Sequence, residues 1–566
     1  MHLCLFLYFV FAHSTPIQSE VLSGVKEIEP TLQSRNQLRG ISGELLRKAV
    51  CHLIEHCSLA KLPFHSDPIV DLWRIFLDEC IVHKEVEVQN AAKAAYPAFL
   101  TTYLYTGTGA LRVDYRDELF AHLLAQLRDT TSESKLAGYL YVFAHAPADL
   151  CSGHVSILMD QLVTACRISP KTRCWGEARG NALASLVGLC EQLGPKHLEM
   201  TAAVLNPVWP NLLRSLADYT LDSRGDIGSR VRETGMECLQ KFLSFLTTNR
   251  LVDYIQPDLV LETVVCIVQQ ALEKIDRTRG VAGQVFATLL HHQPPIPHFP
   301  HLDALKRLFP KEECDKLVWR SARQIFPNFI RLLEFPDFRF RIILGLTVSV
   351  GGLTEDTVIC STEALANYLL LHEQDIVFIH DFLTVVEQVF ETYSHDERII
   401  VPWFKFIDFL LNNPVICSAV EKDSPIMLRL IENIWLQTKS VRDVHRIKAA
   451  IDAFGGMLQF EGPIQKRAKY ILLILLGHRY PVIRKSAATK LYECLLVYDL
   501  TEPNLLDQTV NLLTETIWES DISVVRPVRN HLCELFGSDV PVSAGSKSSQ
   551  NNQSPLDLNN KDGDVR

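Results

Sequence analysis

Residues 483–491 read IRKSAATKL, in which an apolar residue precedes an arginine, a small residue stands three positions after that arginine and a leucine four positions later. Other copies of this pattern, V-R-x-x-A-x-x-x-L, begin at Leu46, Val88, Ala178, Val231, Thr278 and Val525. Some copies are degraded, with Val50, Gly235 and Arg529 in the place of the small residue. The recurrence identifies an internal repeat.

The spacing of the copies indicates the fold. Arg47 and Gln89 are 42 residues apart, and so are Arg484 and Arg526, whereas Arg232 and Arg279 are 47 apart. The 90-residue gap between Gln89 and Arg179 divides nearly in half at a faint copy around Lys135. A period in the forties with helical patterning is typical of paired-helix units. The sequence therefore predicts an all-α fold, an α-solenoid of HEAT/armadillo-like helical repeats.

The residue types of the motif fit two antiparallel helices stacked on similar neighbours. The apolar residue and the final leucine lie on one helix face, and the small residue allows a second helix to approach closely. The arginine buries its stem between repeats while its guanidinium binds a carboxylate. Asp226 and Glu273 each precede a motif arginine by six residues and are expected to meet a guanidinium of the same or the next repeat. The predicted structural ladder consists of Arg47, Arg179, Arg232, Arg279, Arg484 and Arg526.

Composition excludes several classes of protein. A length of 566 residues is too great for one compact core, and 47% hydrophobic residues exclude wholesale disorder. A net charge of −10 without a basic run argues against nucleic acid as the main partner. The 15 cysteines include no C-x-x-C and are expected to be free thiols in a reducing compartment. We expect a cytoplasmic protein.

The first twelve residues, MHLCLFLYFVFA, are apolar like the core of a signal peptide, but they lack a basic leader and are too short to span a bilayer. One interpretation is an alternative or artificial start on a cytosolic protein with no membrane insertion. The other is an extracellular or membrane-anchored protein, which would require cleavage or glycosylation at Asn552.

The expected organisation has five parts. Residues 1–36 form an atypical, poorly ordered N-terminal segment, and residues 538–566 form a disordered polar tail rich in Ser, Asn and Asp. HEAT-like repeats occupy residues 37–194 and 391–537, on either side of a helical domain at 195–390. Within that domain the proline-rich stretch 294–300 is predicted to be a rigid extended connector.

Catalytic chemistry has no visible basis in this sequence. It contains no nucleotide-binding loop, no nucleophile elbow and no zinc spacing. The histidines at 291, 292, 298 and 301 lack a supporting cysteine or carboxylate, and we expect a surface loop there. Residues 222–233 begin and end with an acid as a calcium loop does, but Arg224 and Gly228 stand at ligand positions, so a tight charged turn is expected. We predict a non-enzymatic protein with no catalytic, cofactor-binding or metal-binding residues.

Five segments, in order, resemble the tubulin-folding cofactor D family, also called tubulin-specific chaperone D. They are residues 218–228 (DYTLDSRGDIG), 269–277 (QQALEKIDR), 294–298 (PPIPH), 344–355 (LGLTVSVGGLTE) and 478–485 (HRYPVIRK). The likeness extends from about Leu38 to Gly537, and residues 195–390 resemble the C-terminal domain of the family. The N-terminal repeat half of the family has no counterpart here, and residues 1–36 do not resemble the family sequence.

The resemblance implies a cytoplasmic, cytoskeleton-associated folding cofactor without cofactors of its own. Family members bind β-tubulin, act on the αβ-tubulin heterodimer with tubulin cofactors C and E, contribute to GTP hydrolysis by tubulin and bind an Arf-like small GTPase. The arginine that acts on GTP belongs to cofactor C, so no arginine of this chain is assigned to that role. A generic HEAT-repeat adaptor with a different client is the alternative.

Partner contacts are expected where the family likeness is densest and the repeat packing does not demand the residue types. These positions are Asp218, Tyr219, Asp222, Arg224, Asp226, Arg232, Pro295, Pro297 and His298.

Overall fold

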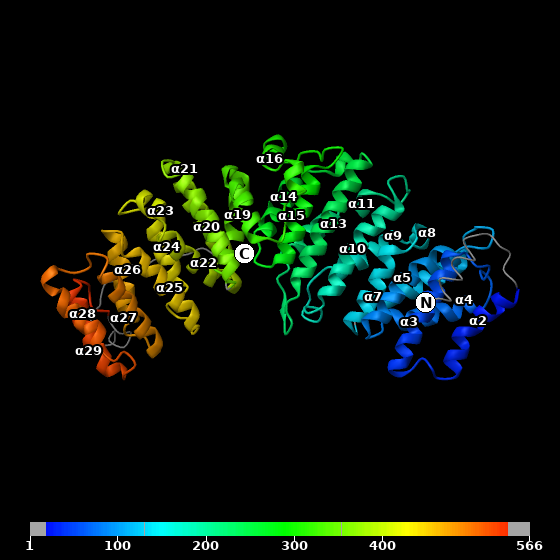
Figure 1. Ribbon diagram of the computed structural model, residues 1–566, viewed down its shortest axis with the longest axis horizontal. Helices are drawn as coiled ribbons and strands as arrows, with labels where there is room; N and C mark the ends of the chain where they lie inside the picture. The colour runs from blue at the N-terminus through cyan, green and yellow to red at the C-terminus, as the bar shows by residue number, and fades with distance from the viewer. Residues whose placement is uncertain (1–18, 130, 353, 542–566) are drawn as a thin grey trace, which may run out of the picture. The chain divides into compact units, whose positions relative to one another are not determined.

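The computed structural model describes residues 19–129, 131–352 and 354–541 (Figure 1). The apolar start and the polar tail from residue 542 onward lie outside the described residues. The chain divides into two compact units, Met1–Gly345 and Leu346–Arg566. The division between them falls inside the stretch 195–390 that the sequence suggested as one domain.

The first unit is a succession of helix pairs. The helices onto which the repeat motif falls are α3 (Gly40–Leu59), α5 (Val86–Tyr103), α7 (Glu133–His145), α10 (Gly176–Leu193), α13 (Gly228–Thr248) and α15 (Asp276–Leu290). Each of these motif helices packs on the next one along the chain. The paired helices are α4 (Ile69–Ile81), α6 (Val113–Arg128), α9 (Val155–Ala165), α12 (Val208–Ser215) and α14 (Pro257–Ala271), with short α8 (Ala148–Cys151), α11 (Ala202–Leu205) and η1 (Val252–Tyr254) in the connections.

Small residues in the motif permit the close packing of these helices. A Cβ added at Gly235 would lie 2.0 Å from the Ser215 side-chain oxygen of the paired helix α12. One added at Gly138 would lie 2.5 Å from the carbonyl oxygen of Ile81 in α4. Since real Cβ atoms do not approach so closely, the two degraded copies with glycine mark close helix contacts rather than a loss of the repeat.

The N-terminal segment differs from the sequence expectation. Residues 19–34 form helix α2 (Ser19–Ser34), whereas we expected residues 1–36 to be poorly ordered. Val25 is buried, and the ammonium of Lys26 lies 2.7 Å from an oxygen of Asp67 and 6.0 Å from the ring centre of Phe64. The contacts of Lys26 hold α2 against the loop before α4, which the repeat pattern did not reveal.

The end of the first unit departs from regular pairing. After α15 the chain forms α16 (Leu302–Leu308), α17 (Lys311–Cys314), α18 (Ala322–Ile330) and η2 (Arg331–Glu334), and α19 (Pro336–Val350) follows. The turn before α18 packs on α15 where the repeat would place another motif helix: a Cβ at Gly283 would lie 2.1 Å from the Trp319 ring. The aromatic side chain thus fills the space that a helix would occupy.

The second unit again consists of helix pairs. Its helices are α20 (Glu355–Leu371), α21 (Ile376–Tyr393), α22 (Glu397–Leu411), α23 (Pro414–Ala419), α24 (Pro425–Leu436), α25 (Val444–Met457), α26 (Pro463–Leu475), α27 (Pro481–Leu495), η3 (Pro503–Leu505), α28 (Leu506–Glu515) and α29 (Ile522–Leu535). Helix α25 packs on both α22 and α27, so these three continue the series of motif helices.

Sheet is nearly absent from the described residues. It consists of one antiparallel pair, β1 (Leu221–Asp222) with β2 (Gly225–Asp226), and an isolated bridge between Tyr105 and Leu111. The predicted all-α solenoid of helical repeats is therefore confirmed.

Candidate protein-interaction site

Buried arginines link successive repeats in both units. Arg179, Arg279 and Arg484 are each no more than 3% exposed, and each donates to the carbonyl oxygen of the residue six positions earlier. Each also donates to the turn that follows in the stack. Arg179 binds the Asp218 carboxylate before α13, and Arg484 binds the Trp518 carbonyl before α29. Arg279 binds the Arg320 carbonyl in the turn before α18. One guanidinium therefore holds two consecutive turns together.

Arg232 is the most enclosed of these side chains, with no exposed surface. Its guanidinium lies 3.1 Å from an oxygen of Asp226 and 3.6 Å from an oxygen of Glu273 in the next repeat. Its Nε donates to Gln270 at 3.0 Å, and its Cζ lies 4.0 Å from the ring centre of Tyr219. Both carboxylates expected six residues before a motif arginine thus meet the same guanidinium, one from its own repeat and one from the next.

The charge of Arg232 is secured by its neighbours. Burial lowers the pKa of a cation, but here the nearby Glu273, Tyr219 and Asp226 outweigh burial, so the pKa of Arg232 is raised above its ordinary value. A permanently charged guanidinium inside the stack fixes the turn that carries Asp218 and Asp226.

That turn is the short β1–β2 hairpin, which projects a polar tip. Leu221 is 64% exposed, and the Arg224 side chain is 67% exposed. Arg224 binds the Asp222 carboxylate at 2.7 Å, and these hydrogen bonds lower the pKa of Asp222. Because buried arginines hold both of its ends, the hairpin is a rigid protrusion that offers an exposed leucine beside a neutralised ion pair.

The structure separates the expected contact residues into two groups. Asp218 and Arg232, 3% and 0% exposed, were predicted as contacts, but they are enclosed by the ladder and offer no surface to a partner. Asp222, Asp226 and Tyr219 are half-buried. Of the hairpin positions we had named, only Arg224 is fully exposed.

The connector at 294–301 lies in the same unit as the hairpin. Pro295 and His298 are exposed and Pro297 is half-buried, while Ile296 and Phe299 are buried. The segment is not helical, as its prolines predicted, but it is not extended throughout, because it turns at Pro297 and His298 and His298 has a left-handed backbone. Its buried apolar residues fix it to the body, so Pro295 and His298 are held on a firm surface.

The histidines beside the connector diverge. His291 Nε2 lies 2.9 Å from the carbonyl oxygen of Phe309, whereas His301 lies 3.3 Å from Asp337 and stacks on Phe335 at 4.5 Å between ring centres. Within the described part of the chain, no three His, Cys, Asp or Glu side chains gather in a way that could hold a metal ion. Nor does any helix there have the length and apolar character needed to cross a membrane. The described cysteines, 14 in all, are free thiols.

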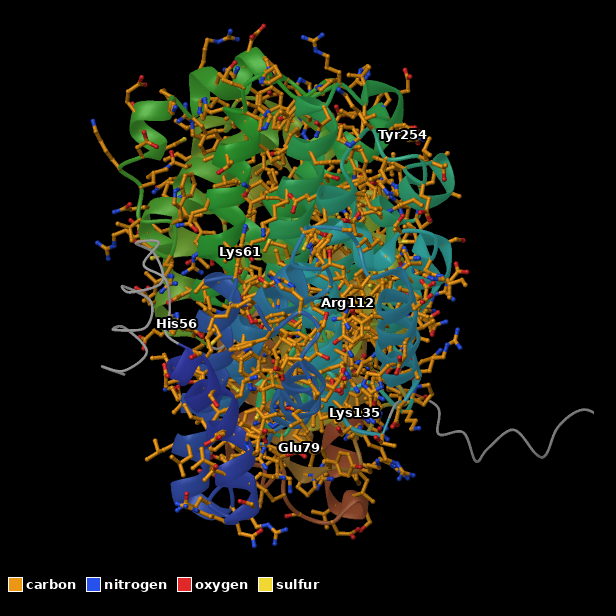
Figure 2. All side chains as sticks on the ribbon, turned by 90° about the vertical axis from the view of Figure 1, so that its right-hand side faces the viewer. His56, Lys61, Glu79, Arg112, Lys135 and Tyr254 are labelled. Atoms are coloured by element: carbon orange, nitrogen blue, oxygen red, sulfur yellow. The ribbon has the colours of Figure 1, made fainter. Side chains whose placement is uncertain are left out.

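The ends of the predicted ladder differ from its centre. The Arg47 side chain is 15% exposed and forms an ion pair with Glu79, which is labelled in Figure 2. It also donates a hydrogen bond to the Cys80 sulfur at 3.7 Å. Arg526, expected in the ladder, is exposed, and the buried arginine of α29 is Arg529. The prediction for Arg526 is wrong because α29 presents the residue three positions later to the neighbouring helices.

Sequence reasoning missed one ladder residue, Arg446. It is 5% exposed and bridges from α25 to Glu397 of α22 at 3.1 Å. His445 precedes it where the motif has an apolar residue, which hid the copy. A search for arginine followed three residues later by alanine, here Ala449, finds it 38 residues before Arg484.

Comparison with known proteins bears on the function of this scaffold. Residues 261–446 match the family model described as tubulin folding cofactor D C terminal. Tubulin-specific chaperone D of Dictyostelium discoideum is 22% identical over 528 residues, which is 82% of this chain and 35% of that protein. Tubulin-folding cofactor D of Schizosaccharomyces pombe is 26% identical over 159 residues, 28% of this chain and 14% of that protein.

These matches confirm the resemblance to tubulin-folding cofactor D that the sequence segments indicated. The chain spans about a third of the length of the Dictyostelium relative. The alignment with the crystal structure of an engineered protein covers 83% of this chain and 98% of that protein, at 13% identity and a TM-score of 0.28. No argument rests on this likeness.

Proposed function

We propose that this chain, which resembles tubulin-folding cofactor D, is a non-catalytic tubulin chaperone scaffold. It binds β-tubulin and takes part in assembly and disassembly of the αβ-tubulin heterodimer. The observation that carries the proposal is the family match over 261–446, together with the five family segments in order. The fold supports it, since helical-repeat stacks present extended binding surfaces to a client protein.

The contact surface we propose consists of the hairpin tip and the proline connector in the first unit. Both are held by buried neighbours, and both expose side chains that the helix packing does not use. Rigid, pre-organised protrusions lose little conformational freedom on binding. The exposed members of this surface are Leu221, Arg224, Pro295 and His298.

The expected contact is mainly apolar and driven by shape. The chain carries a net charge of −10, and the exposed hairpin ion pair is internally neutralised. Long-range attraction therefore adds little, and tubulin capture should survive a rise to about 150 mM salt, where charges are screened beyond about 8 Å.

The other roles belong to the same proposal. Partnership with tubulin cofactors C and E and with an Arf-like small GTPase, and a contribution to GTP hydrolysis by tubulin, are proposed on the resemblance. Action in the cytoplasm, in association with the cytoskeleton, is proposed on the same ground.

Binding of purified tubulin to the full 566-residue chain tests the proposal. We expect saturable binding in biolayer interferometry. The variant Leu221→Asp/Arg224→Glu should lose at least about tenfold in affinity, because the first change places a charge in an apolar contact and the second removes the partner that neutralises Asp222. Arg323→Glu/Arg442→Glu, at exposed positions elsewhere, is the control. The absence of tubulin binding at both low and physiological salt would instead favour a HEAT-repeat adaptor with another client.

A further inference from the structure

A pocket of about 470 Å³ lies between two connections on the first unit, and its lining includes no residue of the hairpin or the proline connector. One wall comes from the end of α6 and the start of α7, and the other from the connection between α9 and α10. Arg128, Arg167 and Lys171 line it, and no described carboxylate does. Its size is within the range of ligand sites in proteins.

The wall between α9 and α10 is fixed by Arg179, which itself lines the pocket. Arg179, 2% exposed, donates to the carbonyl oxygens of Thr172 and Arg173 at 3.0 Å each. The hydroxyls of Ser169 and Thr172 lie 2.8 Å apart. The pocket is thus preformed, so little ordering is required when a ligand enters.

Apolar side chains provide the second feature of the pocket. Ile168 is 53% exposed and Trp175 is half-buried, and the buried Leu127 and Leu136 also line the pocket. A partly exposed isoleucine beside a tryptophan is an apolar contact that the stack itself does not cover. A ligand that fills the pocket would remove both from water.

Two of the cations at the rim, Arg128 and Arg167, are available to a ligand. Arg128 and Arg167 are exposed, and neither forms an ion pair with a carboxylate of the described residues. The nearby acids are engaged elsewhere: Asp129 binds Lys135, labelled in Figure 2, at 2.6 Å, and Glu133 accepts from the backbone N–H of the first turn of α10 at 2.9 Å. Arg128 and Arg167 consequently place positive charge at the rim of this pocket, on a chain whose net charge is −10.

We propose that this pocket binds a short acidic peptide segment of a partner protein, in which a carboxylate side chain is adjacent to a large apolar one. The carboxylate pairs with Arg128 or Arg167 at the rim, and the apolar side chain packs on Ile168 and Trp175. Arginine suits this role because its planar fork recognises a carboxylate through two hydrogen bonds. The inference stands on the pocket alone and is independent of the tubulin role.

The test uses the full chain and a fluorescein-labelled, end-capped heptapeptide of alternating Glu and Leu, followed by fluorescence anisotropy. We expect saturable binding that weakens at least about tenfold in Arg128→Glu/Arg167→Glu, because two attractions become repulsions. Arg323→Glu/Arg442→Glu changes the net charge equally at exposed positions outside the pocket and should bind like the unmodified chain. Peptides with Gln for Glu, or Ser for Leu, should bind more weakly.

Hydrogen exchange of the unmodified chain locates the bound peptide without any substitution. Added peptide should slow exchange in residues 166–175. Slowing confined to other segments, equal losses in the two charge variants, or no saturable binding would each overturn the proposal.

Discussion

Replacing Arg232 with methionine should destabilise the first unit by about 3–5 kcal/mol, the usual cost of removing one partner from a buried ion pair. Methionine keeps an apolar stem of similar reach, so the change removes the guanidinium with little loss of packing. Four acceptors lose this donor, namely the Asp218 carbonyl, Gln270, Asp226 and Glu273. Asp226 and Glu273 each keep one backbone N–H, from Ser229 and Lys274, but lose their cation.

The size of the destabilisation within this range depends on which of the acceptors water can reach after Arg232 is removed. Asp226 retains 16% side-chain exposure and can be rehydrated, whereas Glu273 retains 6% and Gln270 is 1% exposed. The unpaired Glu273 carboxylate therefore dominates, and about 4 kcal/mol is the expected loss. Arg232→Lys, which keeps the charge but not the fork, should lose roughly half as much.

Urea denaturation followed by circular dichroism, with hydrogen exchange of α13 to α15, measures the effect in the first unit. Arg230→Met is the matched control, because Arg230 is exposed on the same helix and should cost less than about 0.5 kcal/mol. If Arg232→Met destabilises no more than Arg230→Met does, the guanidinium does not hold the two turns together and the ladder has no energetic role.

Two further changes test packing and titration. Gly283→Ala should destabilise the chain by about 1–3 kcal/mol in thermal or urea unfolding, because its Cβ would lie 2.1 Å from the Trp319 ring. Gly24→Ala is the control: its Cβ on helix α2 would meet no atom within 4 Å, so it should stabilise by about 0.5–1 kcal/mol. Equal effects of the two substitutions would refute the close approach at Gly283. Burial lowers the pKa of His478, whose Nδ1 accepts from the Tyr480 N–H, so the unfolded chain binds this proton more tightly than the folded chain does. The stability that the neutral His478 contributes is therefore complete above about pH 6.5 and is lost as the pH falls. His478→Asn keeps a hydrogen-bond acceptor and should reduce the fall of the melting temperature between about pH 7 and pH 5. An unchanged dependence of the melting temperature on pH would contradict this.

The sequence predicted the helix pairs because their cause is periodic. An apolar residue, an arginine and a small residue at fixed spacing are demanded wherever one motif helix packs on the next, and so Arg179, Arg279 and Arg484 could be located without coordinates. Arg446 escaped because the residue before it is polar. Helix α2 escaped because its buried Val25 belongs to no repeat.

Which face a side chain occupies was harder to predict. Arg526 and Arg529 lie three residues apart on α29, and their sequence context favours the first, but the neighbouring helices enclose the second. The turn before α18 was likewise invisible, because a tryptophan packed on a glycine replaces a helix without leaving a periodic signal. Such substitutions are decided by shape in three dimensions, which no spacing encodes.

Burial also explains why some of the predicted contact residues are enclosed in the scaffold and others are exposed. Asp218 stands in a segment that resembles the cofactor D family and Arg232 follows it closely, yet the burial of both shows that the architecture needs them there. Leu221 and Arg224 are in the same segment, but no packing requirement accounts for an exposed leucine on the first strand of the hairpin. Variation at the buried pair should therefore change stability and tubulin binding together, whereas variation at the tip should change binding alone. Measuring both quantities for each pair separates the part of the turn that builds the scaffold from the part that meets a client.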